Sequence, residues 1–305
     1  MIRLAVRVAA DRAELVLAEL LALCPAGVEE QDLPDGIVEY AVYGAPGELP
    51  TLPALDAVVG DALVEVLTRE LPDDWSERWK EFHQGILLAP PPGAPVPALN
   101  VRPPWEPASD RARDALEIVI DPGQAFGTGA HATTRLCLEL LLELAAELPA
   151  RGSVLDVGTG SGVLAIAASL LGFAPVAAVD NELESVLAAA ENARVNGASI
   201  AVSRLDIRSA PPPGLGAAEL VLANLLAPLL RDLAHALASA DRRPAHLIAS
   251  GLLEHEADEI AELFASVAGL SLRERRDRGE WSALWLVAGA QAPSESSVAA
   301  QTFAR

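Results

Sequence analysis

The residues best suited to chemistry lie in the middle of the chain, where a glycine-rich stretch separates two aspartates. Asp156 ends a short apolar run and is followed by Gly158, Gly160 and Gly162. Glycines let a backbone adopt positive φ angles and approach a ligand closely, and the helix that we expect next offers free N–H groups in its first turn. Asp180 ends a second apolar run, where its carboxylate can accept hydrogen bonds from both hydroxyls of a ribose. The stretch therefore predicts a site for a nucleoside-type ligand.

The spacing of these glycines excludes two common nucleotide-binding loops. The dinucleotide fingerprint needs its third glycine three residues after the second, where this chain has Val163. A P-loop needs Lys followed by Ser or Thr after the glycines, and this chain has no such pair there. Asp156 would repel a pyrophosphate but attract the cationic amino-acid end of a ligand. The pattern Asp-x-Gly-x-Gly-x-Gly, with Asp180 placed 18 residues after the last glycine, resembles motif I and the acidic loop of class I S-adenosylmethionine methyltransferases.

A second glycine loop, residues 121–134, comes shortly before the first. It leads into a leucine-rich stretch that predicts a helix over residues 135–148. Thr133 or Thr134 is well placed to cap that helix, whose positive end would suit a carboxylate such as that of a methionine moiety. His131 has the chemistry of a base, although a histidine in such a loop is as often a hydrogen-bonding strut.

Alternating strand-like and helix-like segments must position these residues. Helical patterns cover residues 163–171 and 183–195, a buried strand ends at Asn224, and residues 270–288 form a predicted hairpin. We therefore expect an α/β domain over residues 121–288, with a parallel sheet that contains one antiparallel strand.

Three further segments complete the expected organisation. Strand and helix patterns over residues 1–70 predict a small α+β domain that is ferredoxin-like in its order of elements. Residues 71–120 are rich in tryptophan and proline and predict a linker between the two domains. Residues 289–305 have the character of a flexible tail.

Composition limits the partners and the compartment. The 305 residues contain 22 Lys and Arg against 43 Asp and Glu, a net charge of -21. Such a surface should repel nucleic acid and attract basic partners, or else it serves only to keep an Ala- and Leu-rich chain in solution. Cys24 and Cys137 are too few for a disulfide framework and lack the neighbours of a metal site. Without a signal peptide or an apolar membrane span, we expect a cytoplasmic protein that binds no membrane.

Four stretches taken together resemble one family, the ribosomal protein L11 methyltransferases. General class I methyltransferases share the motif I loop but not the loop that precedes it, so the preceding loop, Asp121 to Thr134, is the most specific of the four. A weaker similarity covers residues 250–253. The four stretches are Asp121 to Thr134, Asp156 to Gly162, Val179-Asp180 and Ala223-Asn224-Leu225-Leu226-Ala227.

The resemblance implies a Rossmann-like class I methyltransferase domain that uses S-adenosylmethionine and no metal. Phe126 and Thr128 would belong to a loop that covers the cofactor and faces the target amine. The first domain would hold the substrate, a basic protein of the large ribosomal subunit, and the enzyme is expected to be monomeric. By resemblance, the cofactor contacts fall on Thr134, Asp156, Gly158, Gly160, Asp180, Asn224, Phe126 and Thr128.

The implied reaction is the attack of an uncharged amine on a sulfonium methyl group. A lysine amine has an ordinary pKa of about 10.4, and burial beside a cationic sulfonium lowers that pKa, so no dedicated base is required. Asn224 is the expected catalytic residue, because its side-chain carbonyl can orient the amine. The targets would be lysine side chains, the N-terminal amine, or both.

Two alternatives remain at this point. A methyltransferase acting on RNA or a small molecule is disfavoured by the acidic surface and by the separate first domain. A non-catalytic binding module is disfavoured because Thr134, Asp180 and Asn224 are all retained.

If the first domain only recognises the substrate, the second domain should be independent of it. A chain that begins near Trp105 is then expected to fold and to bind the cofactor.

Overall fold

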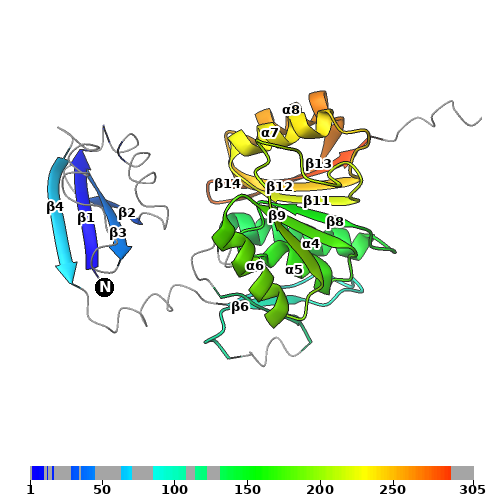
Figure 1. Cartoon of the computed structure of the whole chain (residues 1–305), viewed down its shortest axis with the longest axis horizontal. Coiled ribbons are helices and arrows are strands. Elements are labelled where there is room, and N and C mark those ends of the chain that lie inside the picture. Colours follow the sequence, from blue (N-terminus) through cyan, green and yellow to red (C-terminus); the bar gives the residue numbers. More distant parts are fainter. Residues whose placement is uncertain are drawn as a thin grey trace, which may run out of the picture. The chain divides into compact units, whose positions relative to one another are not determined.

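The computed structural model describes residues 2–9, 12, 16, 29–33, 36–44, 63–70, 85–107, 114–121 and 131–289. The chain divides into two compact units, Met1–Phe82 and His83–Arg305 (Figure 1). Within the described ranges, no helix is long and apolar enough to cross a membrane.

The first unit contains a four-stranded antiparallel sheet in the order β2-β3-β1-β4. Leu4, Val6 and Val8 of β1 are buried, as a strand with one apolar face predicts, and the small Ala5 between them is buried as well. This strand order is the one expected of a ferredoxin-like domain. The helices that would complete such a domain fall almost entirely outside the described residues, so the ferredoxin-like fold stays a prediction. The strands are β1 (Ile2–Ala9), β2 (Glu29–Leu33), β3 (Ile37–Gly44) and β4 (Leu63–Glu70).

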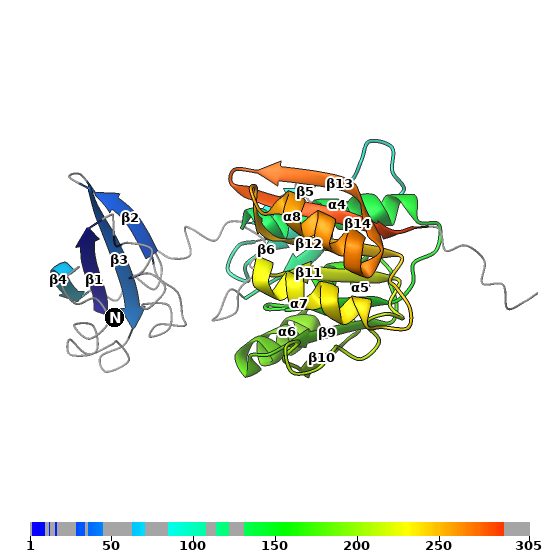
Figure 2. The ribbon, with the colours of Figure 1, turned by 90° about the horizontal axis from the view of Figure 1, so that it is seen from above.

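The second unit is built on a seven-stranded sheet, the large sheet, in the order β10-β9-β8-β11-β12-β14-β13 (Figure 2). Only β14 runs antiparallel to its neighbours β12 and β13, which confirms the predicted parallel sheet with one antiparallel strand. The strand order reverses beside β8, because the chain continues from β8 to β9 on one side and later returns to β11 on the other. Its strands are β8 (Val154–Val157), β9 (Val176–Asp180), β10 (Ile200–Arg204), β11 (Leu220–Asn224), β12 (His246–Leu253), β13 (Leu270–Arg278) and β14 (Trp281–Ala288).

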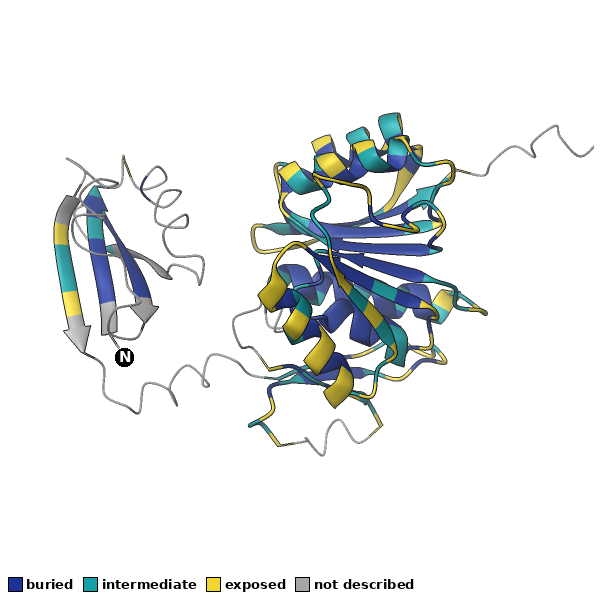
Figure 3. Cartoon of the chain, viewed as in Figure 1, coloured by how far each residue is buried: buried dark blue, intermediate teal, exposed yellow. Residues whose placement is uncertain are grey.

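Helices cover both faces of the large sheet, as Figure 1 shows. One apolar cluster joins side chains of α4, α5 and α6 to one face, and a second joins α7, α8 and the adjoining π-helical turn to the other. The strands between these layers, β8 and β11 above all, are almost completely buried (Figure 3). The helices are α4 (Ala132–Glu147), α5 (Val163–Leu170), α6 (Leu183–Val195), α7 (Ala227–Ala238), α8 (Ala257–Leu263) and the turn Phe264–Ala268.

Residues 85–120 differ from the linker that their composition predicts. Where they are described, they form a three-stranded sheet of β5 (Ile86–Leu88), β6 (Leu99–Arg102) and β7 (Leu116–Val119). Its apolar side chains belong to the same buried cluster as α4 and α5. Prolines occupy the turns between strands, and the alternating apolar residues among them build a sheet that covers the core.

This sheet also corrects the expected truncation point. A chain that begins near Trp105 would lack β5 and β6, and with them the fully buried Leu99 and Val101. Since the boundary between the compact units falls at Phe82 and His83, the second unit begins before β5.

Candidate functional site

A cavity of about 470 Å³ lies at the carboxyl ends of the parallel strands, beside the point where the strand order reverses. Ligands of open α/β sheets bind at such a position. Five of the predicted site residues line it: Thr134, Gly158, Gly160, Asp180 and Asn224. The cavity thus brings together residues from the start of α4 and from the ends of β8, β9 and β11.

The loop after β8 turns sharply on glycines with positive φ angles. Gly158 has φ 73° and Gly162 has φ 85°. A Cβ atom on Gly158 would clash with Cδ2 of Leu225, which also lines the cavity. Glycine at this position therefore permits both the backbone conformation and the close approach of Leu225.

Asp180 fastens the glycine loop to the end of β9. Its Oδ2 accepts a hydrogen bond from the Gly160 backbone N–H at 2.9 Å, and its Oδ1 accepts one from the Glu182 N–H at 3.0 Å. A carboxylate offers about four lone-pair positions, so acceptor capacity remains for a ribose. The two backbone bonds hold Asp180 in place before any ligand arrives.

Asp156 occupies a different place from the one that the sequence suggests. It is completely buried beneath the glycine loop and does not line the cavity. Its Oδ2 accepts hydrogen bonds from Thr159 Oγ1 at 2.7 Å and from the Ala165 N–H at 3.2 Å, whereas Oδ1 has no partner within the described ranges. Burial, with the nearby charge of Asp180, raises the pKa of this carboxyl to about 7, and the two hydrogen bonds limit the rise. Asp156 therefore supports the loop instead of facing the ligand.

The start of α4 corrects the predicted cap. His131, not Thr133 or Thr134, is the N-cap residue, and its Nδ1 accepts a hydrogen bond from the Thr133 N–H at 3.4 Å. The helix consequently begins at Ala132, before the predicted start at Arg135. The His131 ring packs edge-on against Trp281 with 5.0 Å between centroids, and burial lowers its pKa. Of the two roles that the sequence allows, this geometry favours the hydrogen-bonding strut.

Asn224 connects the end of β11 to α4. Its Nδ2 donates a hydrogen bond to Oγ1 of the buried Thr134 at 3.3 Å. With the amide nitrogen engaged, the side-chain oxygen is the group left to accept a bond from a ligand. Next to it, the Leu225 N–H donates to the Ser250 carbonyl at 2.9 Å, which fixes the strand end.

Several cavity residues were not predicted from the sequence. Phe126 and Thr128, which were predicted, lie outside the described residues. The short similarity at residues 250–253 was the only signal for Gly251, and Trp281 lies more than a hundred residues from either glycine loop. The additional lining residues include Thr159, Glu182, Ser185, Leu226, Leu229, Gly251 and Trp281.

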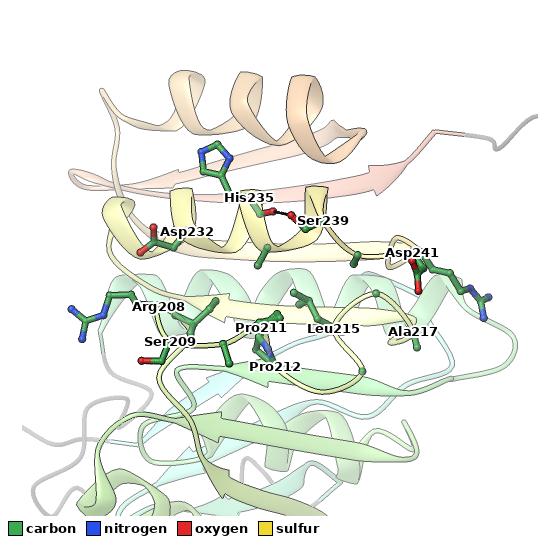
Figure 4. Close-up of a pocket in the computed structure, with 17 residues that line it drawn as sticks. Arg208, Ser209, Pro211, Pro212, Leu215, Ala217, Asp232, His235, Ser239 and Asp241 are labelled. Atoms are coloured by element: carbon green, nitrogen blue, oxygen red, sulfur yellow. Dashed lines mark hydrogen bonds between the residues drawn. The ribbon is translucent and has the colours of Figure 1, made fainter.

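The second unit has another hollow, but the predicted site residues do not line it. A larger hollow of about 900 Å³ lies between residues 207–217 and α7, where Figure 4 shows Arg208, Asp232 and His235 spread along its edges. None of the predicted site residues lines it. Among the residues that the structure describes, no group of three or more His, Cys, Asp or Glu is placed to hold a metal ion.

Comparisons with known proteins converge on one family. Residues 54–288 match the family model described as "Ribosomal protein L11 methyltransferase (PrmA)". The ribosomal protein L11 methyltransferase of Syntrophotalea carbinolica is 38% identical over 265 residues, which cover 85% of this chain and 78% of that protein. The corresponding protein of Bordetella parapertussis is 44% identical over 172 residues, covering 56% and 53%. The crystal structure of a ribosomal protein L11 methylase from Lactobacillus delbrueckii subsp. bulgaricus matches with a TM-score of 0.55 and 34% identity, covering 62% of this chain and 94% of that one.

Proposed function

Because this chain belongs to the ribosomal protein L11 methyltransferase family, we propose that it uses S-adenosylmethionine to methylate amino groups of ribosomal protein L11. One observation carries the proposal. The residues matched by the family include every strand end that lines the cavity, and Thr134, Gly158, Asp180 and Asn224 meet there. The chain is thus a methyltransferase whose retained site residues converge in space.

The cavity fits the cofactor in size and in chemistry. Its volume of about 470 Å³ lies within the usual range of about 300 to 1,000 Å³ for small-molecule sites. Asp180 would accept bonds from the ribose hydroxyls, and the backbone of Gly158 and Gly160 would lie along the ligand. The free N–H groups at the start of α4, beside Thr134, would face its carboxylate. When bound, S-adenosylmethionine supplies a methyl group on a positively charged sulfur.

The residues of the chain would prepare the amine for attack. Leu225, Leu226, Leu229 and Trp281 give the cavity an apolar wall, which favours the uncharged form of an entering amine. The side-chain oxygen of Asn224 would accept a hydrogen bond from the amine N–H and so aim its lone pair at the methyl group. Activity should therefore rise with pH until the amine is largely deprotonated, and a flat profile from pH 6 to 9 under chemistry-limited conditions would contradict this step.

The finer features of the substrate follow from charge and from the two-unit organisation. The targets are lysine side chains, the N-terminal amine, or both, and the first unit grips the folded body of the ribosomal protein. The net charge of -21 complements a basic partner and disfavours direct contact with nucleic acid. The enzyme acts as a monomer in the cytoplasm, where ribosomal proteins are made, and without contact to a membrane.

Methylation of purified substrates tests this function. The protein is incubated with labelled S-adenosylmethionine and unmodified ribosomal protein L11, and mass spectrometry then locates the methyl groups. Label on amines of the ribosomal protein is the expected result. Ribosomal RNA, offered separately, is the matched alternative substrate. Label on RNA with none on the protein would overturn the proposal in favour of an RNA methyltransferase.

A further inference from the structure

Helix α6 carries an asparagine, Asn192, that joins the glycine loop to the backbone just after β7. Only 4% of Asn192 is exposed. Its Nδ2 donates a hydrogen bond to the Ser161 carbonyl at 2.8 Å, and its Oδ1 accepts one from the Asp121 N–H at 3.3 Å. One buried amide therefore satisfies a backbone acceptor in the glycine loop and a backbone donor at the start of the loop that precedes α4.

The first of these bonds acts on the floor of the cavity. Ser161 lies between Gly160, whose N–H is bonded to Asp180, and Gly162, the N-cap residue of α5. Glycines flank Ser161 on both sides, so the bond to its carbonyl adds a restraint beside the turn bond from the Gly162 N–H to the Thr159 carbonyl at 2.9 Å. The Asn192 amide thereby helps to hold the Gly160 N–H against the Asp180 carboxylate.

The second bond holds the backbone two residues after the end of β7. Asp121 begins the segment that leads to His131 and Thr134. One turn after Asn192, Asn196 holds the neighbouring Val119 with two bonds of 2.7 Å, from the Val119 N–H to Oδ1 and from Nδ2 to the Val119 carbonyl. Asn196 therefore anchors the end of β7 itself and makes none of its side-chain bonds to the glycine loop.

We propose that Asn192 is a positioning residue for the methyltransferase reaction, whose amide holds the glycine loop at a fixed distance from the backbone just after β7. The inference rests on the proposed function, since it takes the cavity to be the cofactor site. Asn192 lies outside the cavity lining and would act only through Ser161 and Asp121. Its loss should be felt in cofactor binding first and in the chemical step less.

The pair Asn192→Asp and Asn196→Asp separates this role from general support of the fold. Both substitutions conserve size and replace an amide donor by an acceptor, one within α6 and the other at its C-cap. In Asn192→Asp, a carboxylate oxygen meets the Ser161 carbonyl, whereas in Asn196→Asp it meets the carbonyls of Val119 and Asn192. Calorimetry with S-adenosylhomocysteine gives the affinity, steady-state kinetics with ribosomal protein L11 gives kcat and KM, and thermal unfolding gives Tm.

Asn192→Asp is expected to lose about tenfold or more in affinity for S-adenosylhomocysteine, with a similar rise in KM for S-adenosylmethionine and a smaller change in kcat. Asn196→Asp should also lower Tm, but by less because Asn196 is only partly buried, and it should leave affinity within about twofold. Equal losses of affinity in the two variants, or unchanged affinity in Asn192→Asp, would overturn the proposal. Asn192→Ser, whose hydroxyl is too short to span both loops, repeats the test if the aspartate variant does not fold. Failure of the wild-type chain to bind S-adenosylhomocysteine would instead refute the proposed function.

Discussion

The buried carboxyl of Asp156 offers the sharpest test of the site's construction. Replacing Asp156 by Asn leaves the size of the side chain unchanged, and the amide oxygen can still accept the bonds from Thr159 Oγ1 and the Ala165 N–H. The substitution removes the ability to ionise and places an NH2 group at the Oδ1 position. We expect the variant to gain stability relative to the wild type as the pH rises.

The size of the gain follows from the pKa. In the folded protein the pKa of Asp156 is raised from 3.8 to about 7, so folding favours the protonated carboxyl. The contribution to stability is complete below the ordinary pKa and is lost as the pH rises through about 7. A rise of about three units, at about 1.4 kcal/mol each, amounts to about 4 kcal/mol in total. Between pH 5 and pH 8, about 2 to 3 kcal/mol of it should disappear from the wild type alone.

Urea unfolding of both proteins at pH 5 and pH 8 measures this difference. The amide group placed at the unpartnered Oδ1 position adds a cost, but that cost does not depend on pH and cancels when the two pH values are compared. The free energy of unfolding of the Asp156→Asn variant, minus that of the wild type, should be larger at pH 8 than at pH 5. Parallel pH profiles for the two proteins would refute the assignment of a buried, proton-binding carboxyl to Asp156.

Three further predictions address the cofactor, the amine and the first unit. Asp180→Ala should weaken binding of S-adenosylhomocysteine by about 1.5 to 3 kcal/mol for each charged hydrogen bond lost, and unchanged affinity in calorimetry would remove Asp180 from ribose binding. Asn224→Ala should reduce kcat more than cofactor affinity, because its role is to aim the amine; equal losses in both would make it a cofactor-holding residue only. A chain beginning at His83 should fold and bind S-adenosylhomocysteine yet lose nearly all methylation of ribosomal protein L11, and an undiminished rate would require another role for the first unit.

The site elements that the sequence predicted are those whose signals are local. Gly158, Gly160 and Asp180 lie within one stretch of strand, loop, helix and strand, where apolar runs and turn residues mark the boundaries. The residue types in that stretch define both the fold and the ligand class. β8, α5 and β9 accordingly occur close to where the patterns place them.

The parts that were missed depend on contacts between distant residues. β6 and β7 pair in parallel, with Val101 opposite Ile118, across a segment whose prolines dominate its composition. The contact of His131 with Trp281, and the bonds from α6 to Val119 and Asp121, likewise join residues that are far apart in the chain. The local patterns of a single sequence do not reveal which distant residues pair. Composition alone therefore suggested a linker where the chain forms a sheet.

The cap of α4 shows how a tertiary contact can override a local preference. Threonine is the better N-cap residue by propensity, and Thr133 and Thr134 both stood at the predicted start. An N-cap hydroxyl must point back at the N–H groups of its own helix, whereas the Thr134 hydroxyl is completely buried and accepts the Nδ2–H of Asn224. Both demands cannot be met by one oxygen in one position. With His131 as the N-cap, Thr134 lies in the first turn, where its hydroxyl joins α4 to the end of β11. The contact with Asn224 thereby shifts the start of the helix toward the N-terminus.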